Sequence, residues 1–181
     1  MYDAERSRRH LERLPEILSQ NGLDGWILFT RESAPDPLAA EFGAGNAVAR
    51  MALLFGNIDG AFRRLAICAS YDVTPLRESG LYDEVVGYGS EGAKPHLVAW
   101  LPRFGPGPLG IDVSRDIPAA DGLAAGMRDY LTEAAGAETA GRFVSAEGLV
   151  VDLFSRRSAE EIALIEEAAR RSHEVLTLVL T

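Results

Sequence analysis

The sequence predicts an α/β fold of three layers, in which a mixed sheet of roughly six strands is flanked by helices and followed by a C-terminal linker helix. Two observations support this fold class. Short apolar runs of strand type alternate with segments whose apolar residues have helical spacing. One pair of apolar runs is separated by Asp59-Gly60, which is typical of the turn in an antiparallel hairpin. The sheet is therefore expected to be mixed.

The first half of the domain is predicted to contain one helix and four strands. Ala4–Gln20 has one apolar face and ends at an Asn-Gly pair, and Pro15 within it predicts a kink or two shorter helices. The apolar run Gly25–Thr30 suits a central strand covered on both faces. Residues 31–46 contain prolines and glycines and predict a loop with one helical turn near residues 38–42. The remaining strands are expected at residues 51–55, 64–69 and 83–88.

The second half is predicted to contain two helices and two strands. Residues 94–104 have helical spacing that ends near a proline, and residues 122–135 form a second surface helix. Strands are expected at residues 109–113 and 142–144. A short apolar segment, residues 149–154, then leads to the C-terminal helix.

The C-terminal helix has the strongest local signals. Ser158 and Glu161 form an S-x-x-E capping box. After the capping box, the residues of one helix face follow one another at steps of three or four: Ile162, Ile165, Ala169, Ser172, Leu176 and Val179. The last turn is apolar, which favours a packing partner. Two ion pairs at a spacing of four residues are expected to add a few tenths of a kcal/mol each: Glu166 with Arg170, and Glu167 with Arg171.

Composition and charge restrict the classes of partner. The 181 residues include 18 Lys and Arg against 27 Asp and Glu, a net charge of −9, which disfavours duplex nucleic acid or an anionic membrane as a partner. Cys68 is the single cysteine, so no disulfide framework is expected. The N-terminal residues do not resemble a signal peptide, and no apolar run approaches the roughly 20 residues needed to cross a bilayer. We expect a soluble, cytoplasmic protein.

Residues 87–92, Gly-Tyr-Gly-Ser-Glu-Gly, match the G-x-G-x-x-G pattern of dinucleotide-binding folds. They follow a predicted strand and precede a predicted helix, and Asp112 lies twenty residues after the last glycine. Against this interpretation, Glu91 places a carboxylate where phosphates would bind, and Pro95 and Pro102 shorten the helix. A glycine-rich turn is favoured, and nucleotide binding through Gly87 to Gly92 stays an alternative.

No catalytic or metal-binding residue is expected within the chain. The three histidines lack the paired spacing with carboxylates that a metal site needs. We expect His10 to be a solvated surface residue, His96 to have a structural role at a helix start, and His173 to lie on one face of the last helix. Cys68 lies within an apolar run and is expected to be a buried, inert thiol.

Residues 149–174 resemble the join between two domains in the creatinase, prolidase and Xaa-Pro aminopeptidase group of metallopeptidases. The join in that group has the form L-R-x-x-K-S-x-x-E-I-x-x-I-x-x-A. Arg157 stands where lysine is usual, and Phe154 where arginine is usual. The other positions match: Leu153, Ser158, Glu161, Ile162, Ile165 and Ala168. The order of the predicted elements upstream is also similar to the N-terminal domain of this group.

The resemblance implies a division of the chain and a role for it. Residues 1–157 would form the non-catalytic N-terminal domain, and residues 158–181 the first helix of an absent catalytic domain of the pita-bread type. That catalytic domain would hold a pair of divalent ions (Mn, Zn or Co) through two Asp, one His and two Glu and would hydrolyse proline-containing peptides. This chain would need no cofactor, would be inactive alone, and would shape substrate access and form a homodimer.

Two other interpretations stay open. Creatinase-type members of the group are amidinohydrolases that work without metal, and nothing in these 181 residues distinguishes them from peptidases. The chain could also be a stand-alone α/β binding or interaction module. Because one fold hosts many functions, the fold class alone does not separate these possibilities.

Arg50 is the one candidate for contact with a substrate. It follows a glycine-containing loop and opens a predicted strand, so its guanidinium group is expected at a sheet edge. In dimers of the group named above, the N-terminal domain of one subunit borders the active site of the other. The resemblance thus implies that Arg50 could bind a substrate carboxylate with two parallel hydrogen bonds. An ordinary surface arginine is the alternative.

Overall fold

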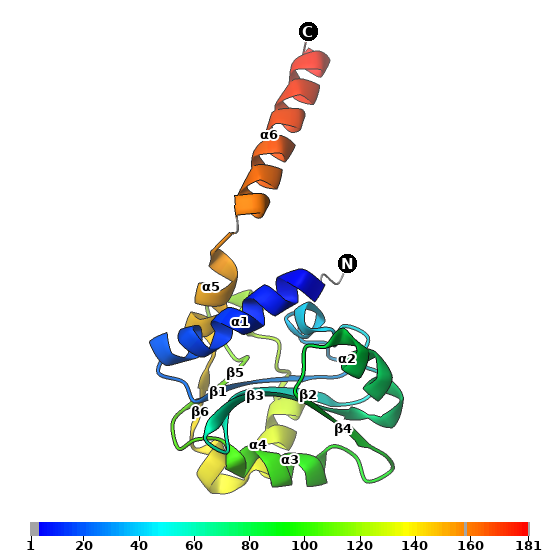
Figure 1. Ribbon diagram of the computed structural model, residues 1–181, viewed down its shortest axis with the longest axis vertical. Coiled ribbons are helices and arrows are strands. Elements are labelled where there is room, and N and C mark those ends of the chain that lie inside the picture. Colours follow the sequence, from blue (N-terminus) through cyan, green and yellow to red (C-terminus); the bar gives the residue numbers. More distant parts are fainter. Residues whose placement is uncertain (1–3, 158, 181) are drawn as a thin grey trace.

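A mixed β-sheet forms the centre of the fold in the computed structural model, which describes residues 4–157 and 159–180. Within these residues the sheet has six strands in the order β4-β3-β2-β1-β5-β6 (Figure 1). Strand β2 is antiparallel to β1 and β3, and the other neighbours are parallel. The strands are β1 (Gly25–Thr30), β2 (Met51–Ile58), β3 (Ala61–Ala69), β4 (Glu84–Tyr88), β5 (Leu109–Ile111) and β6 (Phe143–Ser145).

The two central strands are mostly apolar because both of their faces are covered, and Asn57 near the end of β2 is their one exposed residue. Side chains alternate between the faces of a strand. In β1, Trp26 and Leu28 point into one core, whereas Ile27 and Phe29 point into the other. All six residues of β1 are buried, as the continuous apolar run predicts.

Helices cover both faces of the sheet, which confirms the three-layer α/β prediction. On one face lie α1 (Ala4–Gln20), α2 (Val73–Ser79) and α5 (Glu147–Ser155), and on the other lie α3 (Lys94–Trp100) and α4 (Ala125–Ala140) (Figure 1). The hairpin between β2 and β3 turns at Asp59 and Gly60, where both residues have positive φ angles of 54° and 80°. This conformation matches the twist of the two strands.

Helix α1 is one helix that includes Pro15, so of the two expected outcomes, a kink or two shorter helices, the second is wrong. Proline costs about 3 kcal/mol in a helix interior. The apolar face of α1 buries Leu11, Leu14, Ile17 and Leu18. Burial of each such side chain contributes about 1.5–3 kcal/mol, which together exceeds the cost of the proline.

Other differences concern short elements and boundaries. Helix α2 lies between the strands predicted at residues 64–69 and 83–88, where the sequence pattern predicts no helix, and the apolar segment at residues 149–154 lies within α5. A short run such as Gly148 to Phe154 does not distinguish a strand from two helical turns, because it has no decisive period. Strands β2 and β3 are longer than predicted, and α4 is displaced toward the C-terminus with a non-helical residue, Gly136, inside it.

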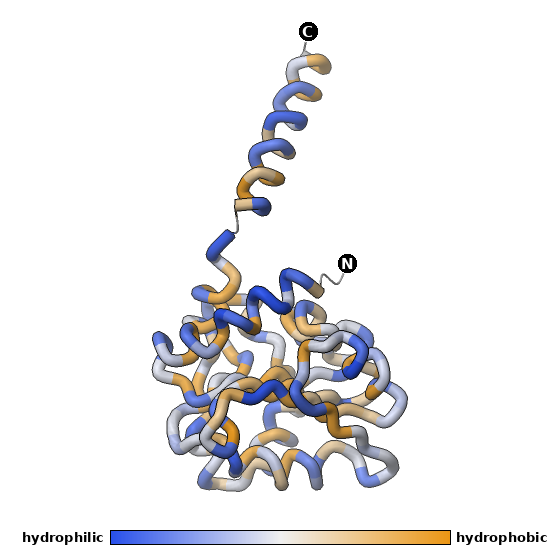
Figure 2. Tube along the Cα trace, in the orientation of Figure 1, coloured by the Kyte–Doolittle hydropathy of each residue, from blue (hydrophilic) through white to orange (hydrophobic). Residues whose placement is uncertain are grey.

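Helix α6 (Ala159–Leu180) extends away from the domain, as Figure 1 shows. Its apolar residues are concentrated toward its two ends, and its middle is polar (Figure 2). Large apolar side chains on it are exposed, including Ile165 at 56%, Leu176 at 59% and Val179 at 77%. The part of the chain that the structure describes contains no helix long and apolar enough to span a membrane.

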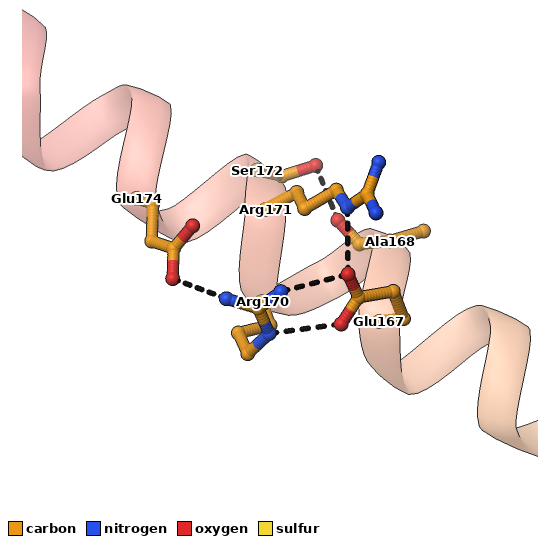
Figure 3. A network of polar contacts seen from close by, with 6 residues as sticks. All are labelled: Glu167, Ala168, Arg170, Arg171, Ser172 and Glu174. Atoms are coloured by element: carbon orange, nitrogen blue, oxygen red, sulfur yellow. Dashed lines mark hydrogen bonds and ion pairs between the residues drawn. The ribbon is translucent and has the colours of Figure 1, made fainter.

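Ion pairs occupy the middle of α6 (Figure 3). The predicted pair of Glu167 with Arg171 is present, with 2.6 Å between the carboxylate and Nε. The predicted pair of Glu166 with Arg170 is not formed, because Arg170 instead donates to Glu167 at 2.7 Å and to Glu174. The capping box depends on Ser158, which lies outside the described residues.

Candidate functional site

One end of the sheet brings together several loops and forms the candidate site. The carboxyl ends of β1, β3, β4 and β5 lie there beside the start of β2. Ligand sites in open α/β sheets lie outside the carboxyl ends of the strands. A hollow of about 310 Å³ opens at this end between the loop after β1 and the loop before β2. It is lined by Thr30, Arg31, Glu32, Pro35, Ala44, Gly45, Asn46, Ala47 and Val48.

Arg50 lies immediately before β2, two residues after Val48 of the hollow, although it does not line the hollow itself. It is at the end of a central strand and not at an edge strand, because β2 lies between β1 and β3. Its Cζ atom is 4.4 Å from the centre of the Tyr130 ring in α4. Tyr130 in turn stacks on Phe29 of β1, with 5.8 Å between ring centres. Such a cation–π contact contributes about 0.5–2 kcal/mol, so the aromatic pair orients the guanidinium group.

The backbone of Arg50 is also anchored. The Tyr88 hydroxyl at the end of β4 donates a hydrogen bond to the Arg50 carbonyl. Burial raises the pKa of Tyr88 to about 12, so this donor keeps its proton at neutral pH. The Tyr88 ring stacks on His96, whose Nε2 atom is 3.3 Å from Glu91 Oε1. His96 therefore has the structural role that its position at a helix start predicts.

Two buried carboxyl groups, Asp36 and Asp112, form an interacting pair near the same end of the sheet. Asp36 is 2% exposed and Asp112 is 1% exposed. Trp26 Nε1 donates to Asp112 at 2.7 Å, and the Leu38 backbone N–H donates to Asp36 at 2.8 Å. The pair was missed in the sequence because Asp36 lies in a loop without a recognisable motif.

The surroundings of both carboxyl groups favour the protonated form. The pKa of Asp112 is raised well above its ordinary value, mainly by burial and in addition by the charge of Asp36. Burial also raises the pKa of Asp36, although the Leu38 N–H and the hydrogen bond with Asp112 oppose this shift. Two adjacent buried carboxylates repel each other, so we expect Asp112, whose pKa is raised well above its ordinary value, to hold a proton and donate it to Asp36.

The structure separates the two parts of the nucleotide-binding motif. Gly87 and Tyr88 belong to β4, an edge strand, whereas Asp112 follows β5, with three strands between them. Asp112 is also bonded to Trp26 and paired with Asp36, so it is not available for a ribose. The Gly89 N–H, which a phosphate would need, donates to Glu91 Oε1 at 3.0 Å. Residues 89–92 therefore form a glycine-rich turn that follows β4.

The expectation for His10 is wrong. His10 is buried, and its ring meets the Phe154 ring edge-on with 4.7 Å between centres. Burial lowers the pKa of His10, although the charge of Glu41 opposes this. The signal was present in the sequence, because His10 lies on the same helical face as Leu14 and Ile17.

The remaining candidate residues lie apart from the hollow. Cys68 is buried in β3, and desolvation raises the pKa of its thiol to about 12, which confirms the inert cysteine. His173 lies on the exposed surface of α6. Among residues 4–157 and 159–180, no three His, Cys, Asp or Glu side chains are placed to hold a metal ion.

Comparisons with known proteins support the fold. No family of protein sequences and no curated protein matches the chain. Among solved structures, an Xaa-Pro dipeptidase from Bacillus anthracis is similar, with a TM-score of 0.60 and 21% sequence identity. The match covers 96% of this chain but 43% of the dipeptidase chain, so this chain spans less than half the length of that protein. The chain thus has a prolidase-like α/β fold.

Proposed function

We propose that this chain is the non-catalytic N-terminal domain of a metallopeptidase of the Xaa-Pro dipeptidase or aminopeptidase type. The observation that carries the proposal is the extent of the structural match. Nearly the whole chain, 96%, aligns with the dipeptidase, and that alignment uses only 43% of the dipeptidase chain. In this proposal the divalent metal pair (Mn, Zn or Co) belongs to a catalytic domain, because the described residues offer no cluster for it.

Helix α6 is the proposed first element of that catalytic domain. Ile162, Ile165, Leu176 and Val179 follow helical spacing and are 47%, 56%, 59% and 77% exposed. Complete burial of such a side chain is worth about 1.5–3 kcal/mol. A catalytic domain packed on this face would therefore stabilise the helix and would explain an apolar face that the N-terminal domain leaves exposed.

The sheet end with Arg50 is the proposed contribution of this domain to substrate access. In a homodimer, the guanidinium group held by Tyr130 would bind the carboxylate of a proline-containing peptide in the active site of the other subunit. Arginine suits this task because its planar fork matches both carboxylate oxygens. The proposal needs both copies of the chain and the catalytic domain.

The coding sequence beyond Thr181 is the first test of this function. A continuous frame with two Asp, one His and two Glu as a metal-ligand set is expected. A frame that ends at Thr181 would contradict the proposal and would favour a stand-alone α/β interaction module.

Arg50→Ala in the protein that carries both domains tests the proposed substrate contact. Loss of a charge-assisted hydrogen bond costs about 1.5–3 kcal/mol, so kcat/KM for an Xaa-Pro dipeptide is expected to fall about 10- to 100-fold. Arg103→Ala is the matched control, because Arg103 also lies over an aromatic ring, 3.6 Å from the centre of Trp100, but it pairs with Asp59 away from the hollow. Unchanged kcat/KM in Arg50→Ala would refute the contact.

A further inference from the structure

A cluster of arginines on α1 and on the segment between α5 and α6 lines a second pocket, which Glu161 of α6 also borders. Three of them lie at three- and four-residue steps on α1 and so share one face of that helix. Two more come from the segment between α5 and α6. The pocket has a volume of about 200 Å³, and we call it the arginine pocket. Its arginines are Arg6, Arg9, Arg13, Arg156 and Arg157.

Neighbouring carboxylates balance only part of this positive charge. Arg6 donates to Glu41 at 2.7 Å, and Arg9 to Glu5 at 3.0 Å. Glu161 lines the pocket as well. Among the described residues that line the pocket or form the two ion pairs above with its arginines, five guanidinium groups face three carboxylates, an excess of two positive charges. Arginine does not lose its proton in proteins, so the excess persists at any physiological pH, in a chain whose net charge is −9.

Two buried nitrogen atoms in the wall of the pocket lack a hydrogen-bond partner. They are Nη2 of Arg13 and Nδ1 of His10, and neither has an acceptor or donor among the described residues. His10 is only 9% exposed. A buried polar group without a partner costs about 1–3 kcal/mol. A small ligand that carries several oxygen atoms would satisfy both nitrogens at once.

We propose that the arginine pocket binds the phosphoryl group of free phosphate or of a small phosphate ester. A phosphoryl group carries about −1.5 to −2 charges at neutral pH and three strong acceptor oxygens, which suits an excess of two positive charges and donors from two separate segments. A carboxylate presents fewer oxygens in one plane. Because Arg156 and Arg157 lie between the domain and α6, the bound group would also tie this junction to α1. The inference does not depend on peptidase activity.

Titration of the 181-residue chain with inorganic phosphate at constant ionic strength tests the proposal, with the ring signals of His10 followed by NMR. A saturable shift and a rise in the pKa of His10 are expected, because a bound anion favours the imidazolium ion. Arg13→Gln should weaken phosphate binding about tenfold or more, since a charge-assisted bond is lost. Arg64→Gln is the matched control and should bind as the parent chain does, because Arg64 pairs with Asp83 elsewhere, at 2.6 Å.

The double variant Arg156→Gln, Arg157→Gln keeps the test decisive if Arg13→Gln fails to fold, because both of these side chains are exposed. It should also weaken binding. Glycerol phosphate distinguishes the two sources: binding equal to that of phosphate indicates a phosphate ester, and weaker binding indicates free phosphate. Absence of a saturable shift, equal binding by acetate, or equal binding by the arginine variants would overturn the proposal.

Discussion

At the scale of single residues, the buried pair of Asp36 and Asp112 shows how a polar group can be retained in an apolar core. Each carboxyl group receives a donor, from the Leu38 backbone and from the Trp26 ring. The remaining oxygen atoms, Oδ2 of both residues, contact no other donor among residues 4–157 and 159–180. One shared proton removes the repulsion between them. We therefore expect the stability of the fold to depend on the protonation of this pair.

Asp112→Asn should remove this dependence on pH. The pKa values of both carboxyl groups are raised in the folded protein, so the folded chain holds protons that the unfolded chain releases near the ordinary value. Their contribution to stability is complete below that value and is lost as the pH rises through the raised values. The amide of the variant donates to Asp36 at every pH. Above about pH 4, the unfolding free energy of the variant minus that of the parent is expected to increase with pH. The increase is at most about 1.4 kcal/mol per pH unit.

Urea unfolding at several pH values measures this difference. Asp129→Asn is the control, because Asp129 is an exposed carboxylate on α4. It should leave the pH dependence of the parent chain unchanged. An equal pH slope in Asp112→Asn and in the parent would show that the pair does not share a proton.

At the scale of secondary-structure elements, α6 differs from the other helices in what stabilises it. Helix α1 buries an apolar face against the sheet, whereas the described side chains of α6 depend on ion pairs such as Glu167 with Arg171 (Figure 3). Exposed pairs of this kind contribute about 0.3–0.5 kcal/mol each. Most helical stability in proteins comes from packing of the apolar face, so α6 is expected to be marginal without a partner surface.

Hydrogen exchange compares the two helices directly. In the 181-residue chain, amides in the middle of α6 should exchange much faster than those beside Leu14 and Ile17 in α1, because they open locally without unfolding of the domain. In a protein that carries the catalytic domain as well, the same α6 amides should become protected. Strong protection of α6 in the 181-residue chain would contradict the need for a further domain and would indicate that its apolar face is already covered.

At the scale of the whole molecule, the layers and the sheet could be predicted from local patterns, but the sites could not. The apolar runs at Trp26 and at Leu53, and the turn at Asp59, are short-range signals that the structure retains. Contacts between distant segments have no such signal. Asp36 meets Asp112, and the arginines of α1 meet those after α5, only because the sheet and the α1–α5 packing bring them together.

Helix α5 and His10 illustrate the two ways in which sequence patterns mislead. The apolar run before Phe154 has no period that distinguishes helix from strand, and tertiary packing decides its form. His10 is polar and has arginine neighbours, yet its helical position places it among buried residues such as Leu14. Position on the helix outweighs polarity here, because the ring packs edge-on against Phe154 even though its Nδ1 atom is buried without a partner among the described residues.

The most direct measurement of the proposed role is the hydrolysis of an Xaa-Pro dipeptide with Mn²⁺ by two chains. One is the 181-residue chain, and the other is the same chain extended through the coding sequence that follows Thr181. The extended chain is expected to release proline, and the 181-residue chain is expected to release none. Hydrolysis by the short chain alone, or cleavage of creatine but not of the dipeptide by the extended chain, would contradict the assignment as the non-catalytic domain of a peptidase.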